Sequence, residues 1–243
     1  MKAVLLVGGA GTRLRPLTYV VPKCLLPVGG KPLLEKTMKY LEGHGITEFV
    51  LCVAYLKKQI MDAFGDGSAL GFRIQYAEAD TPLGTAGQLK TAASMLGEAF
   101  LTMNGDIVTD LNVSKLVATH RRLGGMATIA LKEFDVKIPY GHVNVDGAGK
   151  VTAFEEKPTL RYMANAGVYV MEPDILEEIP SGKVASLETD VFPKLIAKGK
   201  TINSYFESAY WADVGSMADF ERVNDEALSD PALTVAKKPV PID

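Results

Sequence analysis

The chain has 243 residues, 47% hydrophobic and 23% charged, and can bury a large core as one sizeable domain or two. A net charge of −3 gives no overall attraction to nucleic acid or an anionic membrane, so neither is expected as a partner, and phosphate binding has to depend on local residues. Two cysteines, Cys24 and Cys52, are too few for a disulfide framework and show no zinc-ligand spacing. With no apolar run of about 18 residues that could span a bilayer, these features predict a cytoplasmic protein with reduced thiols.

Strand-like runs alternate with helical patterns through the first half of the chain. The predicted strands are 2–7, 48–53, 72–77, 99–103 and 126–131, and the predicted helices are 32–44, 56–64, 84–96 and 113–123. This alternation predicts a Rossmann-like α/β fold with a mostly parallel central sheet flanked by helices. From Tyr140 the pattern changes to shorter β segments with an Asp-Gly turn signal, and we expect this β-rich second half to extend the same sheet.

The chain shows no Gly/Ser-rich linker and no internal repeat. This favours one domain over residues 1–227. Residues 228–243 contain the proline-bearing stretch DPALTVAKKPVPID, which is typical of a loose tail.

The stretch LLVGGAGTRLRPLT, residues 5–18, places three glycines and two arginines after the first strand. Glycines let the backbone turn sharply and bring N–H groups close to an anion, although an ordinary turn with solvated arginines is the alternative. The stretch is no P-loop, because Arg13 and Leu14 stand where GxxxxGK[ST], counted from Gly8, needs Gly and Lys. It also lacks the third glycine of GxGxxG, which disfavours a nicotinamide oxidoreductase.

Residues directly after parallel strands are candidates for a site, because ligands of open α/β sheets bind beyond the carboxyl ends of the strands. Asp106 follows the predicted strand 99–103, and its carboxylate would suit Mg²⁺. The alternative is a turn residue or a cap for the helix at Val113, for which Asp110 is the better candidate. Asp213 has a similar alternative as the cap of a helix near Ser216, a role that Ser216 itself can fill.

A series of short motifs resembles one family. GGAGTRLRPLT and PKCLLPV are followed in order by PLGTAG, NGD, YG, FEEKP, NAG and WADVG, which together cover essentially residues 1–227. In this order the motifs resemble the sugar-1-phosphate nucleotidyltransferases, which make nucleotide-diphosphate sugars, and among these they look most like the mannose-1-phosphate guanylyltransferases. Each motif alone is weak, but the set is highly specific.

The resemblance implies a role for each matched residue. The catalytic residues would be Arg13, Lys23, Asp106 and Lys157. The nucleotide would bind at Gly8, Gly9, Gly11, Thr12, Arg13, Gly84, Thr85 and Ala86, and the sugar phosphate at Gly141, Glu156, Lys157, Asn165 and Gly167. Asp106 and Asp213 would hold Mg²⁺ as the cofactor. From the residues alone, a solvated Lys23 and a solvated Glu-Glu-Lys edge remain the alternatives.

The implied reaction transfers a nucleotidyl group from a nucleoside triphosphate to a hexose 1-phosphate and releases pyrophosphate. GTP with mannose 1-phosphate is favoured, and dTTP or UTP with glucose 1-phosphate is the alternative. A catalytically silent, nucleotide-sugar-sensing regulatory subunit is the alternative from another class. The presence of five charged residues argues against it: Arg13, Lys23, Asp106, Lys157 and Asp213. Many relatives carry a C-terminal left-handed β-helix, which we do not expect here because only a short stretch follows residue 227. A homo-oligomer stays open.

Overall fold

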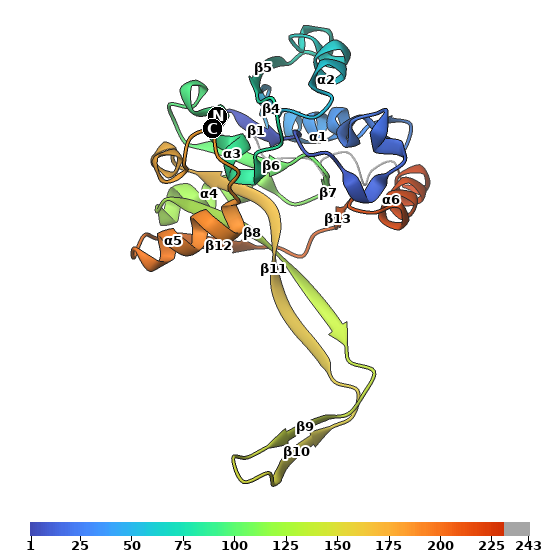
Figure 1. Cartoon of the computed structure of the whole chain (residues 1–243), viewed down its shortest axis with the longest axis vertical. Coiled ribbons are helices and arrows are strands. Elements are labelled where there is room, and N and C mark those ends of the chain that lie inside the picture. Colours follow the sequence, from blue (N-terminus) through green and yellow to red (C-terminus); the bar gives the residue numbers. More distant parts are fainter. Residues whose placement is uncertain (231–243) are drawn as a thin grey trace.

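The computed structural model describes residues 1–230, so most of the predicted tail, residues 231–243, lies outside the described part. Its centre is a seven-stranded sheet with the strand order β12-β8-β11-β6-β1-β4-β5 (Figure 1). These strands are β1 (Ala3–Leu6), β4 (Glu48–Val53), β5 (Arg73–Glu78), β6 (Phe100–Asn104), β8 (Ala127–Lys137), β11 (Thr159–Met171) and β12 (Ile202–Phe206). β11 runs antiparallel to β6 and β8, and every other neighbouring pair is parallel. The predicted α/β fold with a mostly parallel sheet is confirmed.

Helices flank this sheet. The α-helices are α1 (Leu33–Glu42), α2 (Lys57–Phe64), α3 (Gly84–Thr91), α4 (Val113–Leu123), α5 (Phe192–Ala197) and α6 (Met217–Ser229). Short helical turns are η1 (Thr12–Leu14), η2 (Leu17–Tyr19), η3 (Lys23–Leu25), η4 (Ser68–Leu70), η5 (Ala93–Met95), η6 (Pro173–Glu178) and η7 (Leu187–Val191). None of the helices within residues 1–230 combines the length and the apolar character needed to cross a membrane.

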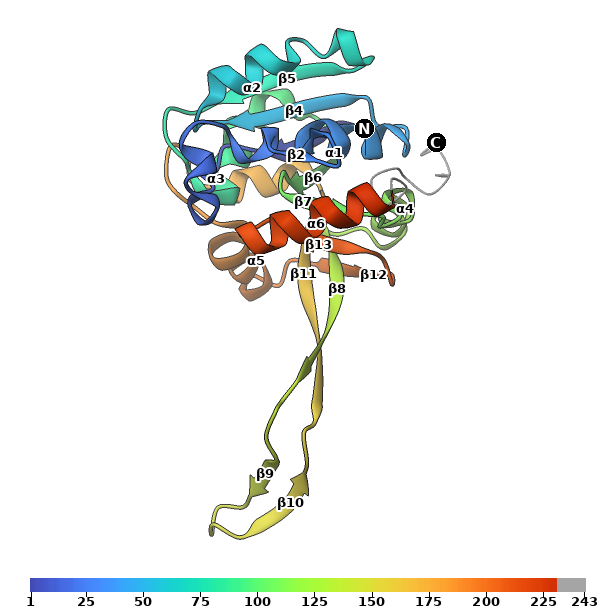
Figure 2. The same ribbon diagram turned by 90° about the vertical axis from the view of Figure 1, so that its right-hand side faces the viewer.

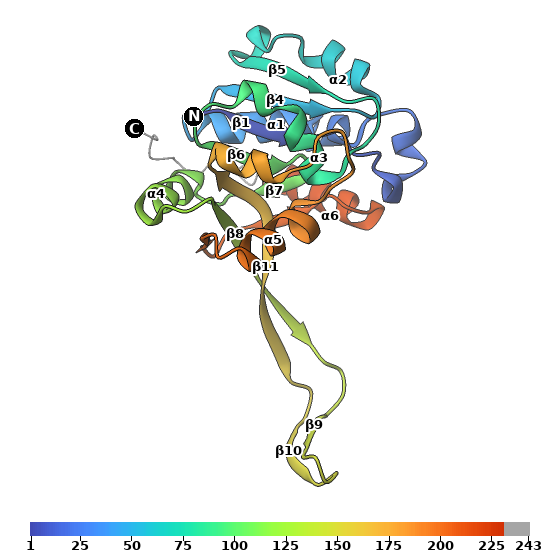
Figure 3. The same cartoon turned by 60° about the vertical axis from the view of Figure 1, so that its left-hand side comes forward.

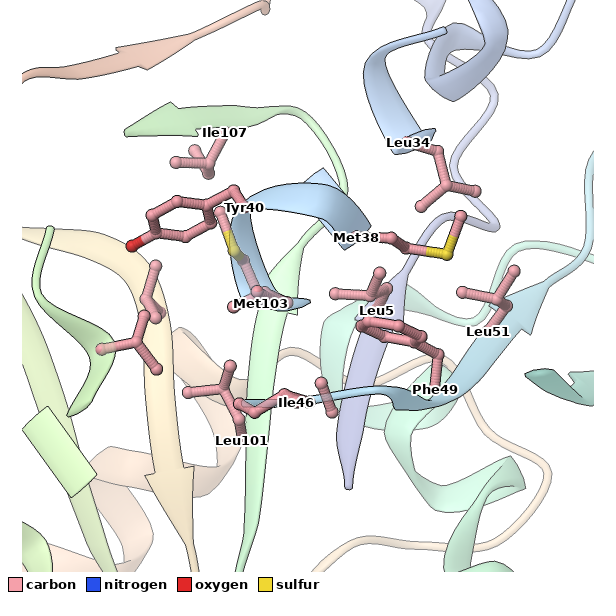
Figure 4. Packing of buried hydrophobic residues seen from close by; sticks show 14 of the residues in the cluster. Leu5, Leu34, Met38, Tyr40, Ile46, Phe49, Leu51, Leu101, Met103 and Ile107 are labelled. Atoms are coloured by element: carbon pink, nitrogen blue, oxygen red, sulfur yellow. The ribbon is translucent and has the colours of Figure 1, made fainter. Parts of the chain in front are cut away.

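Two apolar layers form because successive side chains of a strand point to opposite faces of the sheet. On one face, Leu5 and Leu51 pack against Leu34 and Met38 of α1 (Figure 4). The other face packs against α3, α5 and the turns η6 and η7. Each fully buried leucine contributes about 1.5–3 kcal/mol to folding. This packing holds the amino-terminal strand β1 in the centre of the molecule.

Three smaller strand pairs complete the fold. β2 (Pro27–Val28) pairs with β3 (Lys31–Pro32), β7 (Ile107–Thr109) with β13 (Trp211–Asp213), and β9 (His142–Val145) with β10 (Val151–Glu155), all antiparallel. The β7–β13 pair brings residues 211–213 beside the loop that follows β6.

The β-rich segment after residue 131 departs from the sequence prediction. β8 continues to Lys137 and β11 begins at Thr159, and over these residues the two strands pair only with each other. Beyond them β9 and β10 form a separate two-stranded hairpin, so these two strands do not extend the central sheet as predicted. We call residues 132–164 the arm. Figures 2 and 3 show it projecting from the body as a long twisted ladder with the hairpin at its tip.

Helix ends differ from the prediction at two places. The predicted helix 84–96 ends as α3 at Thr91, and Ala93–Met95 form a separate turn. α4 is capped by Asn112, whose side chain accepts a hydrogen bond from the Lys115 N–H, and not by Asp110 as expected. The Asp110 carboxylate instead accepts from the Tyr210 N–H, because the β7–β13 pairing brings residue 210 beside it.

α6 begins at the predicted cap, Ser216, whose hydroxyl accepts a hydrogen bond from the Asp219 N–H. The helix continues to Ser229, two residues past the boundary predicted at residue 227. Val223 and Ala227 of this helix pack against Val28 and Leu33. The division into a domain and a tail stays a prediction.

Candidate active site

A pocket of about 240 Å³ opens where the parallel strands β1 and β6 end. Its lining residues come from the loop after β1, from η3, from the loop after β6 and from the segment after β13. They are Leu6, Val7, Gly9, Gly11, Thr12, Arg13, Lys23, Cys24, Gly105, Asp106 and Gly215. The pocket therefore lies at the carboxyl edge of the sheet, where the sequence predicted a site.

The loop after β1 uses its glycines for two different contacts. The Gly8 N–H donates to the side-chain oxygen of Gln88 on α3 at 2.9 Å, so this predicted nucleotide-binding group already has a protein partner. Gly11 has φ +57°, a conformation that favours glycine, and it turns the chain into η1, which carries Arg13. Gly9, Gly11, Thr12 and Arg13 line the pocket.

Lys23 lies between the two predicted metal ligands. Its Nζ is 2.5 Å from Asp106 Oδ2 and 3.8 Å from Asp213 Oδ1. All three side chains are partly exposed, between 15% and 35%. Asp106 and Asp213 meet because β7 pairs with β13 in a register that places Ile107 opposite Asp213.

The Asp213 carboxyl group has a shifted pKa. Burial and the neighbouring Asp106 carboxylate raise its pKa, and the positive charges of Lys23 and Arg13 only partly offset this. Asp213 Oδ1 is buried and has no hydrogen-bond partner among the described residues. A buried oxygen without a partner costs folding free energy unless a ligand satisfies it. Two carboxylates with such an oxygen fit Mg²⁺, which is commonly held by one or two carboxylates plus substrate phosphates.

Gly215 lies against the side chains of both Arg13 and Asp213, although it was not among the predicted site residues. A Cβ at Gly215 would lie 2.8 Å from Asp213 Oδ2 and 3.1 and 3.2 Å from the guanidinium nitrogens of Arg13. Any larger residue at position 215 would separate these two side chains. The signal was available, since Gly215 ends the motif WADVG.

The predicted residues at the start of α3 contact another part of the chain. The Ala86 and Gly87 N–H groups donate to the Ala185 carbonyl, and a Cβ at Gly84 would lie 2.4 Å from the same oxygen. Gly84, Thr85 and Ala86 do not line the pocket of about 240 Å³. The structure therefore explains the small residues here by close packing of the backbone, and their contact with a nucleotide stays a prediction.

Glu188 connects this segment to two predicted sugar residues. Its carboxylate accepts hydrogen bonds from the hydroxyls of Thr85, Ser186 and Tyr169. Tyr169 in turn accepts from the amide of Asn165, whose own oxygen accepts from the Gly167 N–H. Burial alone would raise the pKa of Glu188, but the hydrogen bonds, with Ser186 and Thr85 foremost, bring the pKa below its usual value. No motif pointed to Glu188, because two of its partners, Thr85 and Tyr169, come from other segments of the chain.

The remaining predicted sugar residues are on the arm. A Cβ at Gly141 would lie 2.9 Å from Glu156 Oε2, so these two residues are neighbours at the base of the hairpin. Glu156 and Lys157 are exposed, and Lys157 has a positive φ of 49°. The structure does not bring Gly141, Glu156 or Lys157 to the pocket of their own chain (Figure 2).

Two histidines, His44 and His120, and the cysteine Cys24 are assigned no role in the reaction. His44 follows α1 and His120 lies in the last turn of α4, and both are buried, at 2% and 1% exposed. Burial lowers the pKa of His44 to about 4. Cys24 packs in the core, where burial raises the pKa of its thiol to about 12. Within residues 1–230 no three His, Cys, Asp or Glu side chains gather as a metal cluster.

The chain belongs to the nucleotidyl transferase family, whose sequence profile matches residues 2–230. It is 38% identical to the mannose-1-phosphate guanylyltransferase of Mycobacterium tuberculosis, over 90% of this chain and 62% of that protein. It is 34% identical to the UTP–glucose-1-phosphate uridylyltransferase of Synechocystis, over 90% of this chain and 61% of that protein. The chain thus spans less than two thirds of the length of these relatives.

A solved structure of HddC from Yersinia pseudotuberculosis, complexed with GMP-PN, superimposes on the chain with a TM-score of 0.74 at 27% identity. The match covers 93% of this chain and 98% of that one. The resemblance that the motifs indicated is confirmed at the level of the family and the fold.

Proposed function

We propose that the protein is a sugar-1-phosphate nucleotidyltransferase that uses GTP and mannose 1-phosphate. The observation that carries the proposal is the placement of Lys23 between Asp106 and Asp213, with Arg13 beside them, in a pocket at the carboxyl edge of the sheet. The relatives support the class, and the guanylyltransferase and the uridylyltransferase among them support a choice between these two activities.

In this reaction an oxygen of the sugar phosphate attacks the α-phosphorus of the triphosphate. The new P–O bond forms as the bond from the α-phosphorus to the bridging oxygen breaks, and pyrophosphate leaves with the electron pair. Two polyanions have to approach each other, so catalysis depends mainly on charge neutralisation and in-line alignment.

Different residues of the pocket neutralise different phosphate groups. Arg13 offers two N–H donors in a fixed plane and binds the β- and γ-phosphates that depart. Lys23 is a compact positive charge and stabilises the charge that develops at the α-phosphate. The N–H groups of the loop at Gly9 and Gly11 bind the phosphates together with Thr12. Asp106 and Asp213 would hold Mg²⁺, which would supply further positive charge to the phosphates when bound.

The sugar phosphate is assigned to the residues of the arm and of β11. The Glu156 carboxylate accepts hydrogen bonds from sugar hydroxyls, Lys157 neutralises the sugar's phosphate, and Gly141 and Gly167 allow close approach of the backbone. Gly84, Thr85 and Ala86 are assigned to the base. The retained charges at Arg13, Lys23, Asp106, Lys157 and Asp213 favour an active enzyme over a silent regulatory subunit. The two buried thiols suit a cytoplasmic location.

A matrix of four nucleoside triphosphates against mannose 1-phosphate and glucose 1-phosphate, scored by pyrophosphate release, tests the proposal. We expect the largest kcat/KM for GTP with mannose 1-phosphate. A larger value for dTTP or UTP with glucose 1-phosphate would overturn the choice of substrates and leave the class intact. Binding of nucleotide without release of pyrophosphate from any pair would indicate the regulatory alternative.

A further inference from the structure

The arm is a stiff projection whose direction is fixed at its base. Seven residue pairs, from Leu131 opposite Asn165 to Lys137 opposite Thr159, join its two strands. At the base the Phe134 ring meets the Trp211 ring edge-on, and the Trp211 indole N–H donates to the Ala166 carbonyl. Folding the arm back onto its own body would break this ladder.

Two residues assigned to the sugar phosphate, Lys157 and Asn165, lie at opposite ends of this ladder. Ile138 N–H donates to the Pro158 carbonyl, so pairing continues to residue 158, next to Lys157. Six residues lie between Pro158 and Asn165, and at about 3.3 Å per residue they span about 20 Å. Asn165 is at the body end of this span. Figure 3 shows the arm leading away from the body, so Lys157 lies about 20 Å along the ladder from Asn165.

The arm also exposes many large apolar side chains to solvent. Nine of the seventeen large apolar side chains that are exposed among residues 1–230 lie on it: Val136, Tyr140, Val143, Val145, Val151, Phe154, Leu160, Tyr162 and Met163. A two-stranded hairpin is at best marginally stable in water, and contiguous exposed apolar surface marks an interaction site. These side chains need a partner surface.

The body carries exposed apolar residues on two segments, one of which joins two pocket residues in the chain. Tyr19 and Val20 are 58% and 68% exposed and lie between Arg13 and Lys23 in the chain. Val184 is 74% exposed and precedes Ala185, which holds the start of α3. An arm tip that docked here would cover apolar surface on both sides.

We propose that two copies of this chain exchange arms, so that Glu156 and Lys157 of each copy complete the pocket of the other. A second copy is the occupant that the structure favours, because the body holds the phosphate-binding charges and the arm holds the sugar-binding ones. In a dimer with two-fold symmetry, the pocket of each body would receive the sugar-binding residues from the arm of the other copy. The inference deepens the proposed function and rests on it.

Heterodimers of two inactive variants test the exchange. Arg13→Ala damages the body and Lys157→Ala damages the arm, and co-expression with two different affinity tags isolates the mixed pair. The mixed dimer would contain one intact site, made of one variant's body and the other variant's arm. We expect it to recover about half of the parental kcat, while both homodimers stay nearly inactive. A mixed dimer no more active than its parents would overturn the proposal.

The matched control combines Arg13→Ala with Lys23→Ala. Both changes are in the body, so neither body of the mixed dimer is intact, and no recovery is expected wherever the arms lie. Recovery in this pair would show that the gain does not come from exchanged arms and would count against the proposal.

Two further measurements do not depend on activity. Sedimentation equilibrium should give twice the chain mass of 26.1 kDa, and an active monomer would overturn the proposal. Amine cross-linking of a mixture of ¹⁴N- and ¹⁵N-labelled protein should join Lys157 to Lys183 or Lys23 in hybrid-isotope pairs. Cross-links only within one isotope would contradict the exchange. If wild type turned over no substrate pair but gave the dimer mass and hybrid cross-links, the proposed function would fail and the arm exchange would stand.

Discussion

Lys23 Nζ lies 2.5 Å from Asp106 Oδ2, although 83 positions separate the two residues in the chain. The contact joins a cation from the loop after β1 to an anion from the loop after β6, two strands that pair in parallel. A charge-assisted hydrogen bond of this kind holds both side chains in a defined orientation. Lys23 is therefore positioned before any substrate binds. Two predictions concern this centre, and two concern His44 and Glu188, elsewhere in the body.

Arg13→Ala and Lys23→Ala should each lower kcat by about a hundredfold or more, because each removes a charge that stabilises the transition state. Pyrophosphate release under saturating substrates measures the effect, and the melting temperature checks that each variant is folded. Lys58→Ala is the control, since this lysine is 85% exposed on α2, away from the pocket. Parental turnover in either pocket variant would refute its assignment.

Asp106→Asn and Asp213→Asn should each abolish most of the turnover and weaken Mg²⁺ binding, because a neutral amide is a poor ligand for a hard cation. Titration calorimetry with Mg²⁺ follows binding independently of turnover. Asp62→Asn, at an exposed carboxylate of α2, should change neither quantity. Turnover by the wild type that survives complete chelation would contradict the metal assignment.

His44 should make stability fall in mild acid. Burial lowers the pKa of His44 from 6.5 to about 4, and nearby Glu207 offsets this only in part. Below pH 6.5 the unfolded chain binds a proton that the folded protein refuses, so stability is lost as the pH falls from 6.5 toward 4. The free energy of unfolding should drop by about 2 kcal/mol between pH 7 and pH 5 from this group.

Urea unfolding at both pH values measures this slope. His44→Asn keeps a hydrogen-bonding group near the Ser114 hydroxyl, which the His44 ring now contacts at 2.9 Å, but it does not titrate. This variant should lose the His44 part of the slope. His142→Asn changes an exposed histidine and should keep the wild-type slope. Equal slopes for wild type and His44→Asn would show that His44 is not responsible.

Glu188→Ala should lower the free energy of unfolding by about 2–4 kcal/mol, because it leaves the hydroxyls of Thr85, Ser186 and Tyr169 without their shared acceptor. Chemical unfolding measures the change. Glu177→Ala removes an exposed carboxylate from η6 and should change stability by no more than about 0.5 kcal/mol. A Glu188 variant as stable as the Glu177 variant would rule out the network as a support for this region.

The sequence by itself determined the alternation of strands and helices, and with it the edge of the sheet at which a site forms. The period of the apolar residues depends on local geometry, so α4 begins and ends at the predicted residues, Val113 and Leu123. Because β1 and β6 are both parallel strands, their following loops, with Gly9 and Asp106, had to meet at one edge. The motif order then indicated the family.

Only the tertiary structure decided which distant segments meet. Asp213 reaches Asp106 because β13 pairs with β7, and Glu188 accepts from the hydroxyls of Thr85 on α3 and Tyr169 on β11. The alternating pattern of residues 142–155 is the same for a strand of the central sheet and for a separate hairpin, so it could not reveal the arm. Pairing between segments far apart in the chain depends on the complementarity of whole surfaces, which no local pattern of residues contains.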